Sequence, residues 1–358
     1  MSGQSADTGR ALAFFTPPSL ADVRFAAVST VAIIVLSASL LEAGGYDSQL
    51  ALRALWNGSF GSSYALVSAT LVRATPLILT GLAVALAFQA GVFNIGAEGQ
   101  LLAGAALSTV IGVKLGTSLG LLTIPAELIA GAVAGALWAG IAAWLRSQFQ
   151  VLEVISTIML NFVALHVVGF LVRGPLQEPL GIYPQSDVLP PVAQLPRLIA
   201  GTRLHWGLVL AIAVAGALWW SLGHTAAGFR LRASGANPNA ARSAGLINVG
   251  RTTAVAFLIS GALAGLAGSV ELTGVTFALY ENISPGYGYT AIAVALLARV
   301  SPLAVAGTGV FFGALEAGAS AMQRDAGVPA AFVSIVEAGI VLIVIAFDRL
   351  RRDRSISS

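Results

Sequence analysis

The stretch GVFNIGAEGQ, residues 91–100, lies between two apolar runs, TPLILTGLAVALAFQA (75–90) and LLAGAALSTVIGV (101–113). It places Asn94, Glu98, Gln100 and three glycines where hydrocarbon side chains would continue a helix. If the glycines turn or unwind the backbone, the freed peptide groups must be satisfied by protein or water. The stretch therefore predicts a break between two membrane-spanning helices, and the break should line a buried or aqueous cavity.

The composition around this break is that of a membrane protein. The 358 residues are 57% hydrophobic and 10% charged, whereas soluble domains carry about 25% charged residues. A spanning helix needs about 20 mostly apolar residues, because its backbone groups must bond within the segment. We predict an all-α polytopic membrane protein with about ten transmembrane helices, at 25–43, 66–90, 99–116, 119–145, 151–172, 205–222, 252–272, 286–300, 302–322 and 329–347.

The basic residues predict the orientation of these helices. They cluster on alternate connections, and short cytoplasmic loops retain Lys and Arg. With ten crossings, both termini are predicted to be cytoplasmic. The predicted organisation is a cytoplasmic N-terminal segment (1–24), a transmembrane domain (25–348) with an external loop (173–204) and a cytoplasmic loop (223–251), and a cytoplasmic tail (349–358). The external loop is rich in proline, which excludes a spanning helix there.

The predicted helices form two similar groups. Helices two to five and seven to ten are separated by a single helix, which gives the groups opposite orientations, as in inverted-repeat transporters. In the second group, ALYENISPGYGYTAIAVALL (278–297) again interrupts apolar sequence with Gly, Pro and polar residues. Paired interruptions in matching halves point to a solute site.

The cytoplasmic loop contains AGFRLRASGANPNAARSAGLINVG, residues 227–250. Gly235, Asn237 and Pro238 predict a turn, and a short helix follows over 239–244. A short rigid helix between two spans suits a groove on a partner protein. The alternative is an ordinary basic loop that only sets topology.

SGANPNAARSAGLI in this loop resembles the coupling segment of permease subunits of bacterial ATP-binding cassette (ABC) importers, in the superfamily for simple sugars, nucleosides and branched-chain amino acids. Three other stretches share the resemblance, which covers about residues 65–348: LTGLAVALAFQAGVFNIGAEGQLLAGA (79–105), LEVISTIMLN (152–161) and GYTAIAVALLARVSPLAV (288–305). The first is most similar to the nucleoside and simple-sugar branch. The third departs from the family, which often has Gly and Asn before the proline where this chain has Ala298, Arg299, Val300 and Ser301.

The resemblance implies a permease whose coupling residues contact an ATPase subunit. These are Gly235, Asn237, Pro238, Ala240, Ala241, Arg242 and Gly245. It also implies a second, homologous or identical permease subunit, an external solute-binding lipoprotein and a location in the bacterial inner membrane. The chain has no P-loop, since Lys114, its only lysine, follows Val113 rather than glycine. We therefore expect no catalytic residue, metal or cofactor in this chain, and ATP with Mg²⁺ on the partner ATPase.

Two groups of polar residues are candidates for the solute path. Glu153, Thr157 and Asn161 share one face of helix five at i, i+4 and i+8. That face forms either a wet path or an interhelical hydrogen-bond seam, with Glu153 at the cytoplasmic gate or in the seam. Asn94 and Gln100 can donate to and accept from sugar hydroxyls or base edges, whereas Glu98 either lines the path or caps helix three. The neighbouring or matching positions complete the set: Phe88, Gln89, Tyr287, Tyr289 and Thr290.

The alternatives to an ABC permease differ in their energy source or their chemistry. Inverted halves and buried carboxylates also fit an ion-gradient-driven secondary transporter of a similar solute. Glu271, Glu316 and Glu337 could form a proton relay, but their places near helix ends favour contact with interfacial water. An enzyme is disfavoured, since the sequence shows neither a metal-ligand cluster nor a nucleophile beside a histidine. With no Arg or Lys assigned to membrane depth, a neutral hydroxylated solute, nucleoside or simple sugar, is favoured over an anion.

Overall fold

The computed structural model describes residues 20–243, 245, 247–335, 338–339 and 342. Most of the predicted N-terminal segment, all of the predicted tail and part of predicted helix ten, including Glu337, lie outside these residues. The chain forms two compact units, 1–53 with 322–358, and 54–321. In the first unit α2 (Leu20–Ala43) precedes a turn in which the Ser48 hydroxyl donates to Glu42 Oε1 at 2.7 Å.

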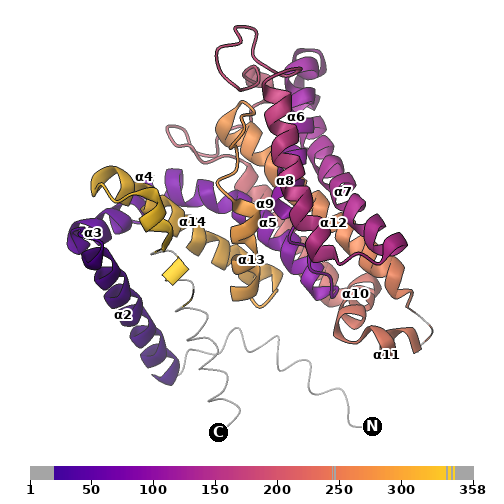
Figure 1. The fold of residues 1–358 in the computed structure, drawn as a ribbon, viewed down its shortest axis with the longest axis horizontal. Coiled ribbons are helices and arrows are strands. Elements are labelled where there is room, and N and C mark those ends of the chain that lie inside the picture. The colour runs from indigo at the N-terminus through magenta and orange to yellow at the C-terminus, as the bar shows by residue number, and fades with distance from the viewer. Residues whose placement is uncertain (1–19, 244, 246, 336–337, 340–341, 343–358) are drawn as a thin grey trace. The chain divides into compact units, whose positions relative to one another are not determined.

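The second unit is a bundle of helices and contains every candidate site residue. Its order is the end of α3 (Ser48–Ser59), α4 (Ser63–Ala65), η1 (Leu66–Thr70), α5 (Leu71–Gln89), α6 (Ala97–Leu119), η2 (Gly120–Leu122), α7 (Thr123–Phe149), α8 (Glu153–Val172), η3 (Pro191–Ala193), α9 (Gly207–His224), α10 (Ala226–Ala236), α11 (Pro238–Ser243), α12 (Val249–Glu271), η4 (Leu272–Thr276), α13 (Tyr287–Leu297) and α14 (Pro302–Asp325), which ends in the first unit (Figure 1). The all-α prediction is confirmed for the described residues, which contain three isolated β-bridges and no strand.

Six described segments are long and apolar enough to span a membrane. One of them, Ala97–Phe149, contains both α6 and α7, which pack against each other after the chain turns at η2. Two shorter apolar helices, Ile33–Ala43 and Tyr287–Leu297, do not reach spanning length. The multi-pass prediction is confirmed, whereas the count of ten and the inverted repeats are not. The six segments are Ser63–Gln89, Ala97–Phe149, Glu153–Val172, Gly207–His224, Val249–Thr276 and Pro302–Asp325.

Glycine lets the central helices approach closely. α12 packs against α5, α6 and α7, and a Cβ added at Gly265 would collide with the carbonyl oxygen of Gly131 on α7. A Cβ at Gly135 would in turn meet the carbonyl oxygen of Gly261. Small residues four apart therefore bring two backbones together, the packing mode favoured between helices in lipid.

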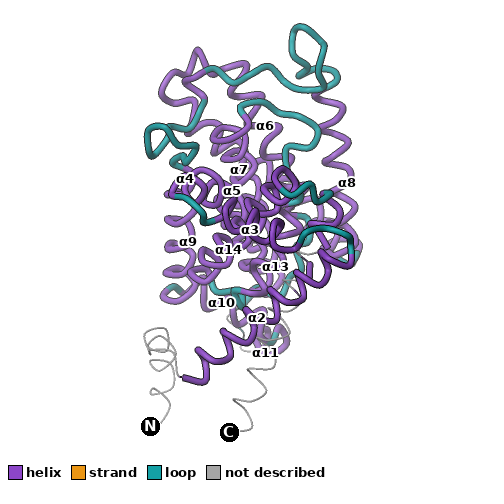
Figure 2. The backbone as a smooth tube through the Cα atoms, turned by 90° about the vertical axis from the view of Figure 1, so that its left-hand side faces the viewer, coloured by secondary structure: helices purple, strands orange, loops and turns teal. Residues whose placement is uncertain are grey.

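Both predicted breaks are present. α5 ends at Gln89 and α6 begins at Ala97, while η4 ends at Thr276 and α13 begins at Tyr287. The 173–204 connection contains only the short η3 helix and otherwise runs as turns and loops. Figures 1 and 2 show α10 and α11 at one end of the second unit and long loops at the opposite end.

Three features were not predicted. α3 is amphipathic and too short for a hydropathy search to find. The basic residues Arg230 and Arg232, assigned to a loop, lie within α10. Arg73 lies inside α5 and within the candidate span Ser63–Gln89, a basic residue that the prediction of a neutral solute did not count.

Candidate functional site

Buried side-chain amides and a serine hydroxyl form a hydrogen-bond network at the break between α5 and α6. Asn94 is fully buried, and its amide exchanges two hydrogen bonds of 2.9 Å with the amide of Gln100. Asn94 Nδ2 also donates to Ser260 Oγ on α12 at 2.8 Å, and Asn94 Oδ1 accepts from the Gly96 N–H at 3.0 Å. The Ser260 hydroxyl donates a hydrogen bond to the carbonyl oxygen of Ala83 at 2.6 Å. The two amides thus satisfy the freed backbone and tie the break to α5 and α12.

α8 binds the same break from the other side. Asn161 is 2% exposed, donates to the carbonyl oxygen of Ile95 at 2.9 Å and accepts from the Gly99 N–H at 2.8 Å. Thr157 is buried and donates to the carbonyl oxygen of Glu153 in its own helix. Glu153 forms an ion pair with Arg146 of α7 at 3.3 Å. In this conformation the two ends of the predicted face, Glu153 and Asn161, bond to other segments, whereas Thr157 between them bonds within α8.

Glu98 joins the two breaks. It lies in the first turn of α6, as expected, but its Oε2 accepts from the N–H of Gly288 in the first turn of α13 at 2.7 Å. A Cβ at Gly288 would collide with the backbone of Ala97 and Glu98. The N-terminal ends of α6 and α13 therefore abut, with a carboxylate at the positive end of the α13 dipole.

The other predicted path residues make separate contacts and do not form one cluster with the junction. Gln89 Nε2 donates to the carbonyl oxygen of Val300 at 2.6 Å. Phe88 makes an edge contact with exposed Phe93, ring centroids 5.3 Å apart. Tyr287 is buried, whereas Tyr289 is 45% exposed and Thr290 is half-buried.

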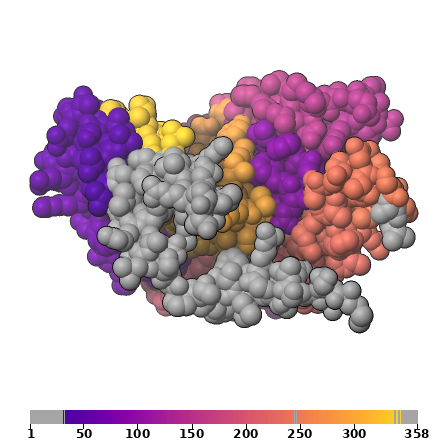
Figure 3. All heavy atoms as spheres, turned by 90° about the horizontal axis from the view of Figure 1, so that it is seen from below, coloured from indigo at the N-terminus to yellow at the C-terminus, as the bar shows by residue number. Residues whose placement is uncertain are grey.

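The predicted coupling residues gather at the end of the unit that carries α10 and α11, which form part of the surface in Figure 3. Asn237 Oδ1 accepts from the Ala240 N–H at 3.0 Å and so caps α11, which begins at Pro238, one residue before the predicted 239–244 helix. Gly235, predicted to lie in the turn, belongs instead to the last turn of α10. Most of the set is exposed: Asn237, Pro238, Ala240, Arg242 and Gly245, while Ala241 is buried and Gly235 half-buried.

Gly235 connects this segment to the first break. Its backbone packs so closely on the turn at 89–91 that an added Cβ would collide with the carbonyl oxygen of Gln89 and lie 2.9 Å from the Gly91 nitrogen. Gly91 has φ +74°, a conformation that glycine adopts without strain. The contact is therefore backbone against backbone, with no flexible side chain to absorb movement.

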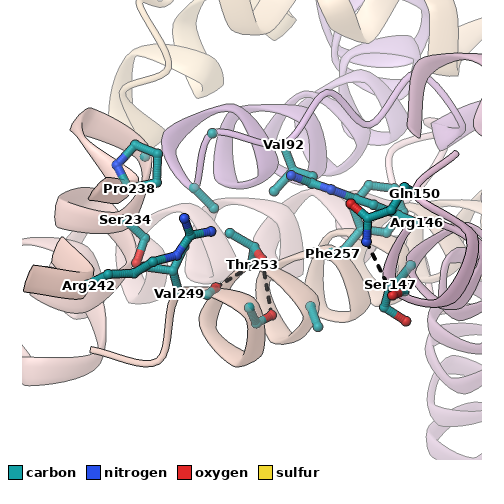
Figure 4. A pocket seen from close by; sticks show the side chains of 16 residues that line it. Val92, Arg146, Ser147, Gln150, Ser234, Pro238, Arg242, Val249, Thr253 and Phe257 are labelled. Atoms are coloured by element: carbon teal, nitrogen blue, oxygen red, sulfur yellow. Dashed lines mark hydrogen bonds between the residues drawn. The ribbon is translucent and has the colours of Figure 1, made fainter. Parts of the chain in front are cut away.

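A cavity of about 340 Å³ opens beside this contact. Its walls come from the turn at 90–92, the end of α7, α10 with α11, and the start of α12 (Figure 4). The side chains of Arg146 and Arg242 enter it from opposite walls.

Sequence reasoning missed two ionisable groups in the bundle, Arg73 and Glu127, and misplaced a third, Glu271. Arg73 on α5 interacts electrostatically with Glu271, which is 5% exposed at the end of α12. Glu271 therefore does not reach interfacial water, against the expectation for helix-end carboxylates. Glu127 on α7 is fully buried, and neither carboxylate oxygen has a hydrogen-bond partner among the described residues. A charged residue inside an apolar run of 20 or more residues is the signal that could have found each.

Among the described residues, no group of three or more His, Asp or Glu side chains is placed to hold a metal ion. The polar atoms of the junction bind one another instead.

Comparison with known proteins identifies the family. A family described as branched-chain amino acid transport system / permease component matches residues 66–346. The chain belongs to this family. The permease is 39% identical over 355 residues to a glucose ABC transporter permease protein of Haloferax volcanii, covering 96% of this chain and 90% of the relative. It is 37% identical over 332 residues to a guanosine ABC transporter permease protein of Bacillus subtilis, covering 90% and 94%. A nucleoside ABC transporter permease protein of Lactococcus lactis is 32% identical over 329 residues, covering 88% and 90%. The chain is thus a permease subunit of an ABC importer.

The departure at the end of α13 has a structural consequence in this permease. Arg299 and Val300 have φ of +50° and +53°. Left-handed backbone is costly for a β-branched residue and easy for Gly or Asn, the residues typical of the family before this proline. The turn is held by the Gln89 bond to the Val300 carbonyl oxygen.

Replacing Asn94 by leucine is expected to destabilise the permease. Gln100, Ser260 and the Gly96 N–H would each lose a buried partner, and a buried unsatisfied group costs about 1–3 kcal/mol. We expect a loss of about 3 kcal/mol or more in unfolding free energy, seen as a lower thermal midpoint of the purified protein. Asn282→Leu, at an exposed position within the second break, should change stability by about 0.5 kcal/mol or less. Equal midpoints for the two variants would contradict the assignment.

His205, just before α9, should make the permease sensitive to acid. It is fully buried, its ring lies on Gly274 of η4, and its Nδ1 accepts from the Gly207 N–H at 3.2 Å. Burial, with a smaller effect of the Arg203 charge, lowers the pKa of His205 to about 4, below the ordinary value of about 6.5. Because the unfolded chain binds the proton first, stability is full above pH 6.5 and falls as pH drops toward 4.

The expected loss between pH 7 and pH 5 is about 2 kcal/mol. Thermal midpoints at the two pH values should therefore differ more for the native permease than for His205→Asn. His224→Asn, which alters an exposed histidine, should keep the native pH dependence. A His205→Asn variant with that same dependence would rule out this histidine as the cause.

Proposed function

We propose that this permease moves a neutral hydroxylated solute, a nucleoside or a simple sugar, across the inner membrane, driven by ATP hydrolysis on a separate ATPase subunit. An external binding lipoprotein would deliver the solute, and a second permease subunit would complete the pore. ATP and Mg²⁺ would bind only to the ATPase. The relatives named for glucose, guanosine and nucleosides support this solute class.

The contact of Gly235 with the turn at 89–91 carries the proposal. It joins the exposed coupling residues to the first break by backbone packing. Movement of an ATPase bound to α11 would shift α10, and α10 would press directly on the end of α5 and the loop leading to α6. A rigid-body displacement can travel through such a contact because packed backbones have few intermediate arrangements.

The junction of α6 and α13 supplies the second element of the mechanism. A displaced loop at 91–96 would alter the Asn94–Gln100 pair and, through Glu98, the start of α13. In the open conformation the same amides would face the path and could exchange partners with solute hydroxyls or base edges. We therefore assign Asn94, Gln100 and Asn161 to both tasks, closing the path and lining it.

Glu98 favours a neutral solute. A free helix N-terminus attracts anions, but the N-terminal end of α13 is already occupied by the Glu98 carboxylate. A phosphate or carboxylate entering the junction would meet a negative charge at close range. Nucleosides and sugars carry no such charge.

The orientation follows from α10 and α11. If they contact a cytoplasmic ATPase, the 173–204 loop at the opposite end faces the binding protein. In that loop the side-chain amide of Gln185, and secondarily the Tyr183 N–H, donates to Glu178 and lowers the pKa of Glu178. This half-buried carboxylate stays charged at neutral pH and would attract a basic patch on the binding protein.

Competition for uptake tests the solute class. Vesicles containing the permease with its partner subunits and binding protein would be assayed for uptake of labelled guanosine and glucose. Unlabelled neutral nucleosides or sugars should compete, whereas guanosine 5′-phosphate and gluconate should not. Competition by the anions at the same concentrations would overturn the proposed solute class.

A further inference from the structure

The cavity at the coupling end has the size and construction of a small-molecule site. Its volume of about 340 Å³ lies within the range of about 300–1,000 Å³ that is typical of ligand pockets. Four separate segments form its walls, including the turn at 90–92 and the coupling helices. It lies apart from the Asn94 and Glu98 contacts of the junction, whose residues do not line it.

Positive charge dominates this cavity. The guanidinium groups of Arg146 and Arg242 point toward each other from opposite walls (Figure 4). None of the sixteen residues that line the cavity is acidic. Arg146 forms an ion pair at 3.3 Å with Glu153, which lies outside the cavity. Among the described residues, Arg242 donates a hydrogen bond only to the neutral amide oxygen of Asn239, at 3.4 Å. Facing like charges repel, and an anion between them would remove that cost.

Two uncharged hydrogen-bond donors, Ser234 and Gln150, also line the cavity beside the two arginines. Ser234 is 2% exposed, lines the cavity, and its hydroxyl has no hydrogen-bond partner among the described residues. A buried hydroxyl without a partner is costly and calls for an acceptor. The Gln150 amide, bonded only at 3.5 Å to the Ser147 carbonyl oxygen, can turn toward the same acceptor. An oxyanion would accept from all of these groups.

We propose that this cavity binds a phosphate monoester of a small polar metabolite. Guanidinium groups match the geometry of phosphate oxygens, and the volume leaves room for an attached pentose or hexose. Val92, Val249 and Phe257 give the organic part an apolar wall. Its cytoplasmic location rests on the orientation proposed above. Phosphoryl transfer from a nucleoside triphosphate to a hydroxyl of the imported solute, which releases the nucleoside diphosphate and the hydroxyl proton, is the class of reaction that would supply such a ligand.

A ligand bound in this cavity would restrict the movement that couples the ATPase to the first break. A phosphate held by both Arg146 and Arg242 would bridge α7 to α11, and α11 is joined through α10 to the Gly235 contact. The bridge would hold together walls that must separate if α10 moves against α7. Bound phosphate monoester should therefore slow uptake.

Ribose 5-phosphate is the direct probe, because it carries the pentose and phosphate monoester without the base that ATPase sites bind. Its binding to the complete importer, in nucleotide-free nanodiscs of phosphatidylcholine, would be measured by calorimetry. We expect binding of ribose 5-phosphate and none of ribose at the same concentration. Absence of binding to the native importer would overturn the proposal, including the case in which an acidic side chain of the ATPase fills the cavity.

Variants locate the site. Arg146→Gln and Arg242→Gln should each weaken binding by about tenfold or more, and Ser234→Ala by about threefold to tenfold. Arg146→Lys keeps the positive charge and should recover part of the lost affinity. Size-exclusion chromatography would show that each variant still assembles into the importer, so that weaker binding is not due to misfolding. Arg251→Gln is the matched control, because Arg251 lies in the first turn of α12 but lines the neighbouring cavity. Loss of binding in Arg251→Gln, or native affinity in Arg146→Gln, would place the ligand elsewhere.

Two further measurements identify whether the ligand is a lipid headgroup or a soluble phosphate, and whether its binding changes uptake. Adding phosphatidylglycerol to the nanodiscs should leave the affinity unchanged, and a tenfold weaker affinity would assign the cavity to a lipid headgroup instead. Ribose 5-phosphate on the ATPase side of vesicles should slow uptake by the native importer and not by Arg146→Gln. Equal inhibition of both would overturn the regulatory role, whereas the uptake rates without ligand report separately on the proposed transport function.

Discussion

Replacing Gly235 by valine is expected to abolish ATP-driven uptake while leaving the bundle folded. A Cβ at this position would collide with the carbonyl oxygen of Gln89, a backbone atom that cannot move without shifting the end of α5. Displacing a mechanical contact by about 1 Å can cost about a hundredfold in rate, and we expect a loss of at least about that size. Uptake and ATPase activity of the reconstituted importer would be measured together, because uncoupling leaves hydrolysis while removing transport.

The matched control is Gly216→Val. Gly216 lies in α9, and an added Cβ there would meet open space. This variant should transport normally. Native uptake by Gly235→Val, at equal expression, would show that the contact at 89–91 does not transmit movement.

Removing the Glu98 carboxylate should have the next largest effect on uptake. In Glu98→Ala the buried Gly288 N–H loses its acceptor, and the N-terminal end of α13 loses its negative partner. We expect a loss of about 1–3 kcal/mol in stability and a loss of about tenfold in uptake, since 1.4 kcal/mol corresponds to tenfold. Glu98→Gln keeps an acceptor oxygen and should fall between the native protein and Glu98→Ala.

Comparing Glu98→Ala with Glu98→Gln distinguishes the role of Glu98 as a hydrogen-bond acceptor from its role as a negative charge. Asp325→Ala, at a carboxylate that is 54% exposed, should match the native protein in both assays. If Glu98→Ala retains native stability and uptake, the carboxylate does not hold the two breaks together. If Glu98→Gln admits guanosine 5′-phosphate as a competitor, the carboxylate also excludes anions, as proposed.

The sequence predicted the helices and both breaks because these depend on local composition. Apolar runs, Gly and Pro give spans and interruptions wherever they occur, and α5, α6 and α13 begin or end within a few residues of the expected positions. The short helix α11 was likewise predicted from local residue types to within one residue, whereas Gly235 belongs to α10 and not to the predicted turn. The six spans found fall short of ten partly because α13 is short.

The partners of the polar residues could not be predicted, because they come from distant parts of the chain. Ser260 lies 166 residues from Asn94, and Gly288 lies 190 residues from Glu98. Nothing in LEVISTIMLN indicates that Asn161 bonds to the loop at 95–99 rather than to solute. Arg73 was overlooked because its neighbours are so apolar that hydropathy alone assigns the whole segment to lipid.

The energy source of uptake tests the central claim most directly. Sealed vesicles would contain this permease with its partner permease, ATPase and binding protein, and labelled solute would be supplied on the binding-protein side. We predict accumulation that requires ATP on the opposite side, persists with an uncoupler, and is lost when Asn237, Pro238 and Arg242 are replaced by alanine. Accumulation in ATP-free vesicles that an uncoupler collapses would contradict the account and identify an ion-gradient-driven transporter instead.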